Sequence, residues 1–294
     1  MLIKRVLTGM LVSVGILEFV SVVGNWTNAL DAEFLVYGQS GGGGGTGGGG
    51  GESGGGGAGT TVTQIIPHVA AGSFAGATET FSTIIQIINA GTTSVELTSI
   101  ELFNQDGSPS TVPFSTTSAT APVFTGTLNN LTLPANDSIV LTAGNTSTGV
   151  INWARIVSEG NVLVLGVFEL RTAGGTLVSR VGVPATVGTM TKLVIPRMRN
   201  VSQNLATAFA LANTSNSEVT ITETLYENAT SIGSATLALG AGNQTAKFAW
   251  EFFSLTSEAS GTNFSHMVLE STAASLSATA LVFEGGNQAT FPIA

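Results

Sequence analysis

The sequence predicts an all-β protein in which two tandem antiparallel β-sandwich modules, immunoglobulin-like in kind, follow a signal segment and a glycine-rich linker. Three observations lead to this fold class. One structural unit occurs twice between residues 61 and 294, short segments rich in Thr, Val and Ile recur between turn residues, and only 9% of the 294 residues are charged. Short strands at such spacing are typical of a sandwich, and a repeated unit indicates stacked modules rather than one catalytic domain.

The repeat is visible in landmarks that occur in the same order in both copies. Each copy begins with an Ile-Pro dipeptide, continues with an apolar run that ends in Asn, and carries Val-Phe-Glu late in its length. The landmarks are Ile66-Pro67, Asn89 and Val167-Phe168-Glu169 in the first copy, and Ile195-Pro196, Asn213 and Val282-Phe283-Glu284 in the second. We therefore expect module 1 over residues 61–187 and module 2 over residues 188–294.

The first 29 residues have the features of an export signal. Lys4-Arg5 forms a short basic start, residues 6–23 are mostly apolar, and Thr27-Asn28-Ala29 offers small residues where a signal peptidase reads them. We expect cleavage after Ala29, with a second choice after residues 22–24. The alternative is a retained N-terminal anchor, although the apolar stretch is near the lower length limit of a membrane span and contains Glu18. Either way, the protein is expected outside the cell or at its surface.

Residues 30–60 are expected to form a flexible glycine-rich linker. Residues 41–59 are almost pure glycine, and a segment without side chains to bury cannot offset its ordering entropy. Its root-mean-square reach would be about 25 Å. The run lacks the Gly-Lys-Ser/Thr ending of a phosphate-binding loop. A packed polyglycine bundle is the alternative.

One apolar patch precedes the glycine run and consists of Phe34, Leu35, Val36 and Tyr37. These four residues could add as a strand to the sheet of a neighbouring molecule, which is a known mode of assembly. The simpler interpretation is a mature N-terminus that has no fixed structure.

The expected strands follow from period-2 alternation and from short apolar runs between turn residues. In module 1 they cover residues 64–69, 80–89, 95–103, 128–133, 138–141, 150–157, 162–170 and 177–183. In module 2 they cover residues 192–195, 207–213, 219–226, 235–239, 245–248, 266–269, 276–283 and 290–293. The alternation over 95–103 changes face along the run, and the apolar runs 84–88 and 162–167 suit central strands.

Longer strings accompany these strands. They are Ile66-Pro67-His68-Val69-Ala70, Leu133-Pro134-Ala135-Asn136-Asp137-Ser138, Trp153-Ala154-Arg155-Ile156-Val157 and Gly182-Val183-Pro184-Ala185 in module 1, and Ala210-Leu211-Ala212-Asn213 and Phe291-Pro292-Ile293-Ala294 in module 2. Through them, residues 61–294 resemble a tandem β-sandwich module of secreted bacterial proteins, especially those of acidobacteria and related soil lineages. The resemblance implies export and an extracellular or surface location, and it implies no catalytic residue. The chain departs from the module in its diglycine-poor first loop, Ala71-Gly72-Ser73-Phe74.

Charge and cysteine content argue against several classes of partner. The net charge is −9 with only nine Lys and Arg residues, whereas nucleic acid and anionic lipid both need clustered basic residues. Contact with a membrane is therefore expected only through an uncleaved N-terminal segment. The chain has no cysteine, so disulfides, thiolate metal sites and a cysteine nucleophile are impossible.

The residues that could support catalysis are few and scattered. The chain has two histidines, His68 and His266, and nothing in the spacing places a serine and a carboxylate around either one. The carboxylates that could form a glycosidase pair are Glu96 with Glu101, Glu169 with Glu284, and Glu223 with Glu227. Because Glu169 and Glu284 occupy matching positions in the repeat, we expect them to share a structural role. We therefore expect no enzyme and no cofactor.

A calcium loop is the remaining metal hypothesis. Asn104, Asp106 and Ser108 surround Gly107 and offer oxygen ligands at alternating positions. The loop lacks a second and a third acid, and a hairpin turn explains the Asp-Gly pair fully. We therefore expect no metal site.

The aromatic residues suggest one contact patch, formed by Phe248, Trp250, Phe252 and Phe253. They could present a platform for sugars or another surface, and the alternative is a core or interdomain plug. Trp153 is expected to pack within module 1.

The chain is thus predicted to be an exported, non-enzymatic structural or adhesive protein that meets protein or polysaccharide at the cell surface. The alternatives are a carbohydrate-binding module protein and a self-associating filament subunit that uses residues 34–37 for strand addition.

Overall fold

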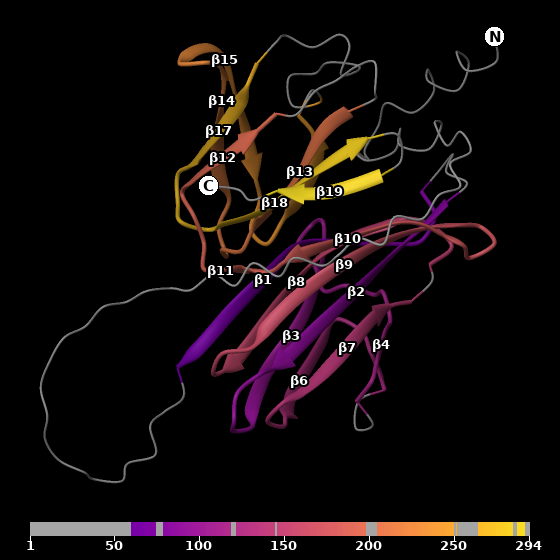
Figure 1. The fold of residues 1–294 in the computed structure, drawn as a ribbon. Coiled ribbons are helices and arrows are strands. Elements are labelled where there is room, and N and C mark those ends of the chain that lie inside the picture. The colour runs from indigo at the N-terminus through magenta and orange to yellow at the C-terminus, as the bar shows by residue number, and fades with distance from the viewer. Residues whose placement is uncertain are drawn as a thin grey trace, which may run out of the picture.

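The computed structural model describes residues 60–74, 79–118, 122–144, 146–197, 205–249, 251, 264–284 and 287–291. Within these ranges the chain forms nineteen β-strands and no α-helix, and the strands pair antiparallel (Figure 1). The predicted all-β class is confirmed. In the described part of the chain, no helix is long and apolar enough to cross a membrane.

Module 1 is a sandwich of two sheets. Its strands are β1 (Thr61–Ala71), β2 (Glu79–Asn89), β3 (Val95–Asn104), β4 (Phe114–Thr116), β5 (Val123–Phe124), β6 (Thr127–Leu133), β7 (Asp137–Ala143), β8 (Val150–Glu159), β9 (Leu163–Thr172), β10 (Leu177–Pro184) and β11 (Thr186–Val187). The sheet order is β11-β1-β8-β3-β6 in one sheet and β10-β9-β2-β7-β4-β5 in the other. Only β4, β5 and β11 were not predicted, because segments of two or three residues are too short to show periodicity.

Module 2 repeats this design with fewer strands. They are β12 (Lys192–Pro196), β13 (Leu205–Asn213), β14 (Val219–Glu227), β15 (Thr230–Leu239), β16 (Gln244–Phe248), β17 (His266–Ser271), β18 (Leu276–Glu284) and β19 (Asn287–Phe291). The orders are β12-β17-β14-β15 and β16-β13-β18-β19. β15 begins five residues before its predicted start at residue 235, because its pairing with β14 shifts between Leu225 and Tyr226 and interrupts the alternation.

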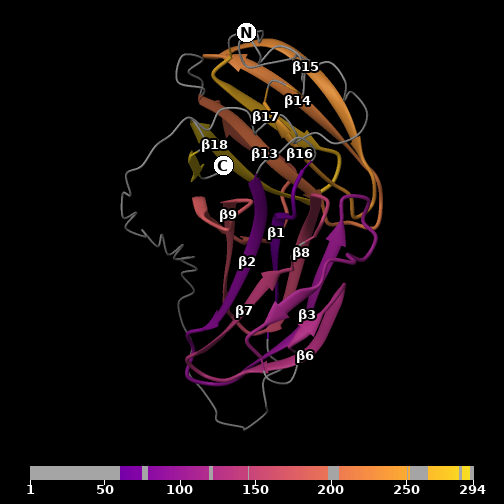
Figure 2. The same ribbon diagram turned by 90° about the vertical axis from the view of Figure 1, so that its right-hand side faces the viewer.

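The two modules share one topology. The order β1-β8-β3-β6 in module 1 matches β12-β17-β14-β15 in module 2, and β10-β9-β2-β7 matches β19-β18-β13-β16. The repeat in the sequence is therefore a repeat of the whole sandwich. Figures 1 and 2 show module 2 seated on one end of module 1, with β13 and β18 on the side that faces it.

The outer strands depart from the immunoglobulin arrangement. The inner pairs β3–β8 and β2–β7 correspond to the C–F and B–E pairs of that fold. In an immunoglobulin domain the first strand pairs with the second, but here β1 pairs with β8 and β9 pairs with β2. Both modules are antiparallel sandwiches, and their outer strands differ from those of the immunoglobulin fold.

Each sandwich has its own hydrophobic core between its sheets. Ile66, Ile87 and Leu141 belong to the core of module 1, and Phe209, Ile221 and Met267 belong to that of module 2. In β3 the pairing with β8 shifts between Leu97 and Ser99, so that Leu97 and Ile100 both face the core. This bulge is the cause of the change of face that the sequence shows.

Two buried asparagines close the equivalent corner of each sandwich. Asn89 Nδ2 donates to Thr93 O, Leu133 O and Pro134 O at 2.8–3.0 Å, and its Oδ1 accepts from Gly91 N. In module 2, Asn213 Nδ2 donates to Ser217 O, Leu239 O and Gly240 O at 2.8–3.0 Å, and its Oδ1 accepts from Ser215 N. These side chains tie the loop after β2 or β13 to the end of β6 or β15.

Candidate functional site at the module junction

The two modules meet through the outer face of the sheet formed by β16, β13, β18 and β19. In β13, Leu211 points into the core of module 2, and Ala212 faces outward and packs on Ile65 and Trp153 of module 1. A second cluster joins Phe168, Val181 and Val183 of module 1 to Leu281 and Phe283 of module 2. Small residues on this outer face, Ala210, Ala212 and Ser277, are buried and allow the modules to approach closely. Because β18 is covered on both faces, its residues 276–282 are all buried.

A polar network crosses the same junction. Gln244 Nε2 donates to His68 Nδ1 at 3.3 Å, Gln105 Nε2 donates to Gln244 Oε1 at 3.3 Å, and Gln244 N donates to Gln105 O at 2.9 Å. Burial lowers the pKa of His68 to about 4, so the ring is neutral at pH 7 and its Nδ1 can accept. His68 also meets the Phe168 ring edge-on, with 5.2 Å between centroids. His68 therefore has a structural role at the junction.

Two glycine turns make the closest backbone contact between the modules. Gly107 has φ +80°, and a Cβ placed on it would lie 2.7 Å from Ala241 O and 3.0 Å from Gly242 C. Only glycine fits there, because the conformation and the space both exclude a side chain. Asp106 Oδ1 accepts from Ser108 N at 3.0 Å and from Ser108 Oγ at 2.6 Å, and these bonds hold the pKa of Asp106 below its ordinary value. The Asp-Gly pair therefore forms a turn, and this turn contacts module 2 at the junction.

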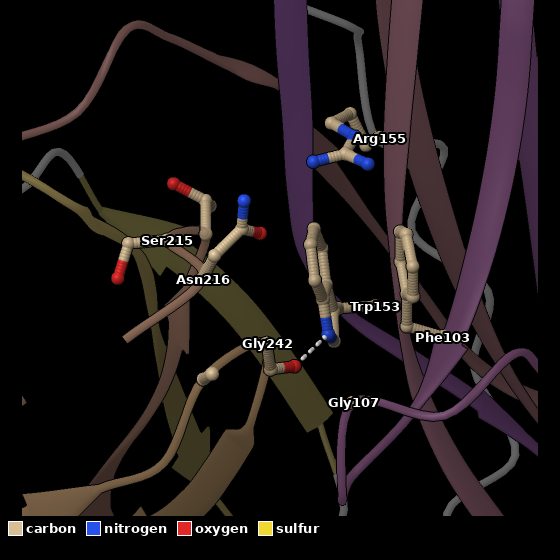
Figure 3. Close-up of a pocket in the computed structure, with 9 residues that line it drawn as sticks. Phe103, Gly107, Trp153, Arg155, Ser215, Asn216 and Gly242 are labelled. Atoms are coloured by element: carbon tan, nitrogen blue, oxygen red, sulfur yellow. Dashed lines mark hydrogen bonds between the residues drawn. The ribbon is translucent and has the colours of Figure 1, made fainter. Parts of the chain in front are cut away.

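A hollow of about 260 Å³ opens beside these turns (Figure 3). It is lined by Phe103, Gly107, Trp153, Arg155, Thr214, Ser215, Asn216, Ala241 and Gly242. The rings of Phe103 and Trp153 stack with 4.4 Å between centroids, and Trp153 Nε1 donates to Gly242 O at 2.8 Å. Trp153 packs on Phe103 and Ile65 of module 1, as predicted, but it faces outward from β8, and module 2 covers its other side through Ala212 and Gly242.

One charged pair borders the hollow. Arg155 forms an ion pair with Glu101 across β8 and β3, and its guanidinium lies 5.1 Å from the centroid of the Phe103 ring. Ser215 and Asn216, from the turn after β13, stand on the opposite side of the hollow (Figure 3). The site therefore combines aromatic edges, a guanidinium, a hydroxyl and an amide. These groups can hold a small polar ligand, but the hollow has no nucleophile with an adjacent base.

The predicted contact patch is placed only in part. Phe248 is the last residue of β16 and is 7% exposed, and its ring lies 5.9 Å from that of Phe283. Phe248 is thus buried on the sheet face that packs against module 1 and is not part of an exposed platform in this structure. Trp250, Phe252 and Phe253 lie outside the described residues, as do Phe34, Leu35, Val36 and Tyr37.

Glu169 and Glu284 do not occupy equivalent positions in their sheets. Glu169 pairs with Ser82, seven residues before Asn89, whereas Glu284 pairs with Leu205, eight residues before Asn213. The two glutamates are thus one position out of register, so the predicted equivalence was wrong. Glu169 is buried, and burial alone would raise its pKa, but hydrogen bonds and charges from Arg171 and Arg180 hold it below the ordinary value.

Glu223 is the one candidate whose environment is unusual. It is 0% exposed, and neither carboxyl oxygen has a hydrogen-bond partner. Burial raises its pKa to about 9, and the charge of Lys247 opposes this shift. Its predicted partner Glu227 is exposed at the end of β14. In the described residues, no group of three or more His, Cys, Asp or Glu side chains could hold a metal ion.

His266 completes the survey of predicted site residues. It stacks on Tyr226 with 5.1 Å between centroids, and its Nδ1 lies 3.0 Å from Ser265 Oγ. Among the described residues, no carboxylate is hydrogen-bonded to this ring.

The sequence did not predict the hollow, although outward-facing aromatics beside the core residues Leu102 and Ala154 were a signal of it. Comparisons with protein-family models, with curated proteins and with solved structures found no match to this chain.

Proposed function

We propose that this chain is an exported, non-enzymatic structural or adhesive protein in which two sandwich modules act as one rigid unit carried by a glycine-rich tether. Its place would be the cell surface or the extracellular matrix. The predicted export signal supports this location, the glycine run in the sequence supplies the predicted tether, and the low charge suits an exposed β-protein.

The observation that carries the proposal is the use of chemically distinctive side chains at the junction. His68, Gln244 and Trp153 hydrogen-bond between the modules, and Gly107 permits the contact of the two turns. His68, one of the two histidines that could have served catalysis, is engaged in holding the modules together. Such a unit can carry load or present a surface without internal motion.

The proposal is tested by measuring how well cells of the source organism attach to a surface when they have or lack this chain. We expect poorer attachment to a surface without it, restored by the wild-type chain and not by a Trp153→Ala, Gln244→Ala double variant. Protease treatment of intact cells should remove both proteins, which shows that the variant is exported. A wild-type chain that stays inside the cell, or attachment that is equal in all strains, would contradict the proposal.

A second candidate is saccharide binding in the junction hollow. Its support is the set of groups that face the hollow, namely the Phe103 edge, Arg155, Ser215 and Asn216. Hydrogen bonds to a guanidinium, a hydroxyl and an amide beside an apolar aromatic edge are suited to a sugar ring. The volume of about 260 Å³ fits a ligand of one ring, since it is near the lower end of usual ligand pockets.

Affinity electrophoresis of the full chain in gels that contain single polysaccharides tests this candidate. Retardation should be lost in Asn216→Ala and in Arg155→Ala, and kept in Asn129→Ala, whose side chain is exposed on β6. Equal mobility of all proteins in every polysaccharide would exclude the hollow as a sugar site. Retardation that survives Asn216→Ala and Arg155→Ala would place the sugar elsewhere.

A further inference from the structure

Each of the two surfaces that meet at the junction has an equivalent on the other module, and neither equivalent is covered by the described part of the chain. In module 1 the stacked pair Phe103–Trp153 is cross-strand, and in module 2 the stacked pair Tyr226–His266 is cross-strand at the matching place on β14 and β17. Module 2 covers Trp153 of the first pair, while Phe103 stays partly exposed at the hollow. Nothing among the described residues covers the second, and both Tyr226 and His266 remain partly exposed.

The turn that docks at the junction also has a counterpart. Gly242 accepts the bond from Trp153 and has φ +69°, three residues after Leu239. In module 1, Asn136 stands three residues after Leu133 and has φ +57°. Because Asn213 and Asn89 anchor the two turns through the same hydrogen bonds, the turns have the same backbone course. Asn136 is exposed.

The sheet face beside that turn carries large apolar side chains in module 1, with Gln86 between them. In module 2 the pairs Ala208–Leu281 and Ala212–Ser277 lie on the outer face that meets module 1. Counting from Asn89 and Asn213, the matching pairs in module 1 are Ile84–Val167 and Ile88–Leu163. All four side chains are at least partly exposed, and Leu163 is 51% exposed.

An apolar outer face is unusual for an antiparallel sandwich, whose second face is ordinarily polar. The four residues Ile84, Ile88, Leu163 and Val167 form what we call the open face of module 1. It is the equivalent of the face that module 2 uses to dock, and it has no partner in the described part of the chain. The Tyr226–His266 pair is the equivalent of the surface on which that face docks.

We propose that a second copy of this chain docks head to tail, placing its open face and its Asn136 turn against the Tyr226–His266 end of module 2. The contact repeats the internal junction between one chain and the next. The two surfaces are different, so the association is heterologous and continues as an open filament or closes as a ring. The proposal does not depend on adhesion or on sugar binding.

The primary test is the size of the purified full chain by sedimentation velocity over a range of concentrations. We expect reversible association that Leu163→Lys weakens by about tenfold or more, because the substitution places a charge inside an apolar contact. Val187→Lys is the matched control, since Val187 is 67% exposed on β11, away from both surfaces. Because Leu163 and Val187 are exposed, both variants should fold, and circular dichroism checks this.

Single engineered cysteines give a second, independent readout because the chain has none. A mixture of Asn136→Cys and His266→Cys chains should form a disulfide-linked heterodimer under mild oxidation, well above the yield from Asn136→Cys with Val187→Cys. A full chain that stays monomeric up to its solubility limit would overturn the proposal. So would association that Leu163→Lys leaves unchanged, which would indicate another contact, such as strand addition by residues 34–37.

Discussion

Modules 1 and 2 have the same strand order, yet they differ in what they bury. Phe103 pairs with Trp153, and Tyr226 pairs with His266. Three residues before each aromatic, module 1 has Ile100 in its core, and module 2 has Glu223, which has no hydrogen-bond partner. The comparison shows that the two modules share the frame and its asparagine anchors, while each core and each outer face has its own chemistry.

The largest expected effect tests the shared part of that comparison. Asn89→Ala and Asn213→Ala should each lower the free energy of unfolding by about 3–5 kcal/mol, because each leaves three carbonyls without their donor. Chemical denaturation measures this, with Asn129→Ala as the exposed control. Losses that differ strongly between the two variants would show that the anchors are not equivalent.

The buried Glu223 makes module 2 sensitive to alkali. Its pKa in the fold, about 9, is above the unfolded value of about 4.3. The stability that the protonated carboxyl allows is therefore complete below pH ~4 and is lost as the pH rises toward 9. We expect Glu223→Gln to be more stable than wild type by on the order of 3–5 kcal/mol at pH 8 and nearly equal at pH 4. Urea titrations at both pH values decide this, and an equal difference at both would contradict the burial of an uncharged carboxyl.

His68 gives the junction the opposite pH dependence. Its pKa in the fold, about 4, is below the unfolded value of about 6.5. Its contribution is therefore complete above pH 6.5 and is lost as the pH falls toward 4, on the order of 2–3 kcal/mol. His68→Gln should remove this pH dependence of the free energy of unfolding. Urea titrations between pH 4 and 7 measure it, and a wild-type stability that stays flat over this range would count against a neutral, buried His68.

The smallest effect concerns one hydrogen bond at the junction. Trp153→Phe keeps an aromatic ring against Phe103 and removes the Nε1 donor to Gly242 O. We expect a loss of about 1–2 kcal/mol in the free energy of unfolding, since the Gly242 carbonyl loses its partner. Phe103→Leu, which keeps that donor and removes the stack, is the companion variant. A Trp153→Phe protein as stable as wild type would show that water replaces the bond freely.

Much of the fold was predictable because its signals are local. Alternation and short apolar runs predicted every longer strand, and even the bulge in β3 was visible as a change of face near Leu97. The register of strand pairing could not be predicted as well. Glu169 and Glu284 follow the same Val-Phe pair, but an offset of one residue in the pairing places their side chains on opposite faces of their sheets. That offset depends on pairing with distant strands, which the local sequence does not encode.

The site was mostly beyond the sequence for a similar reason. Phe103, Trp153 and Asn216 lie far apart in the chain, and only the docking of one sandwich on the other brings them together. Trp153 shows the limit well. Its place in an apolar strand predicted burial, which is correct at 1% exposure, but not that module 2 supplies the cover.

The central claim is that the two sandwiches form one rigid unit, and residual dipolar couplings of the full chain in a dilute aligning medium test it most directly. We expect that one alignment tensor fits the amide couplings of residues 61–187 and of module 2 together. The backbone contact at Gly107 and the Gln244 network leave no room for independent orientation. Two tensors of different magnitude or direction would mean that the modules move independently, and that result would contradict the account.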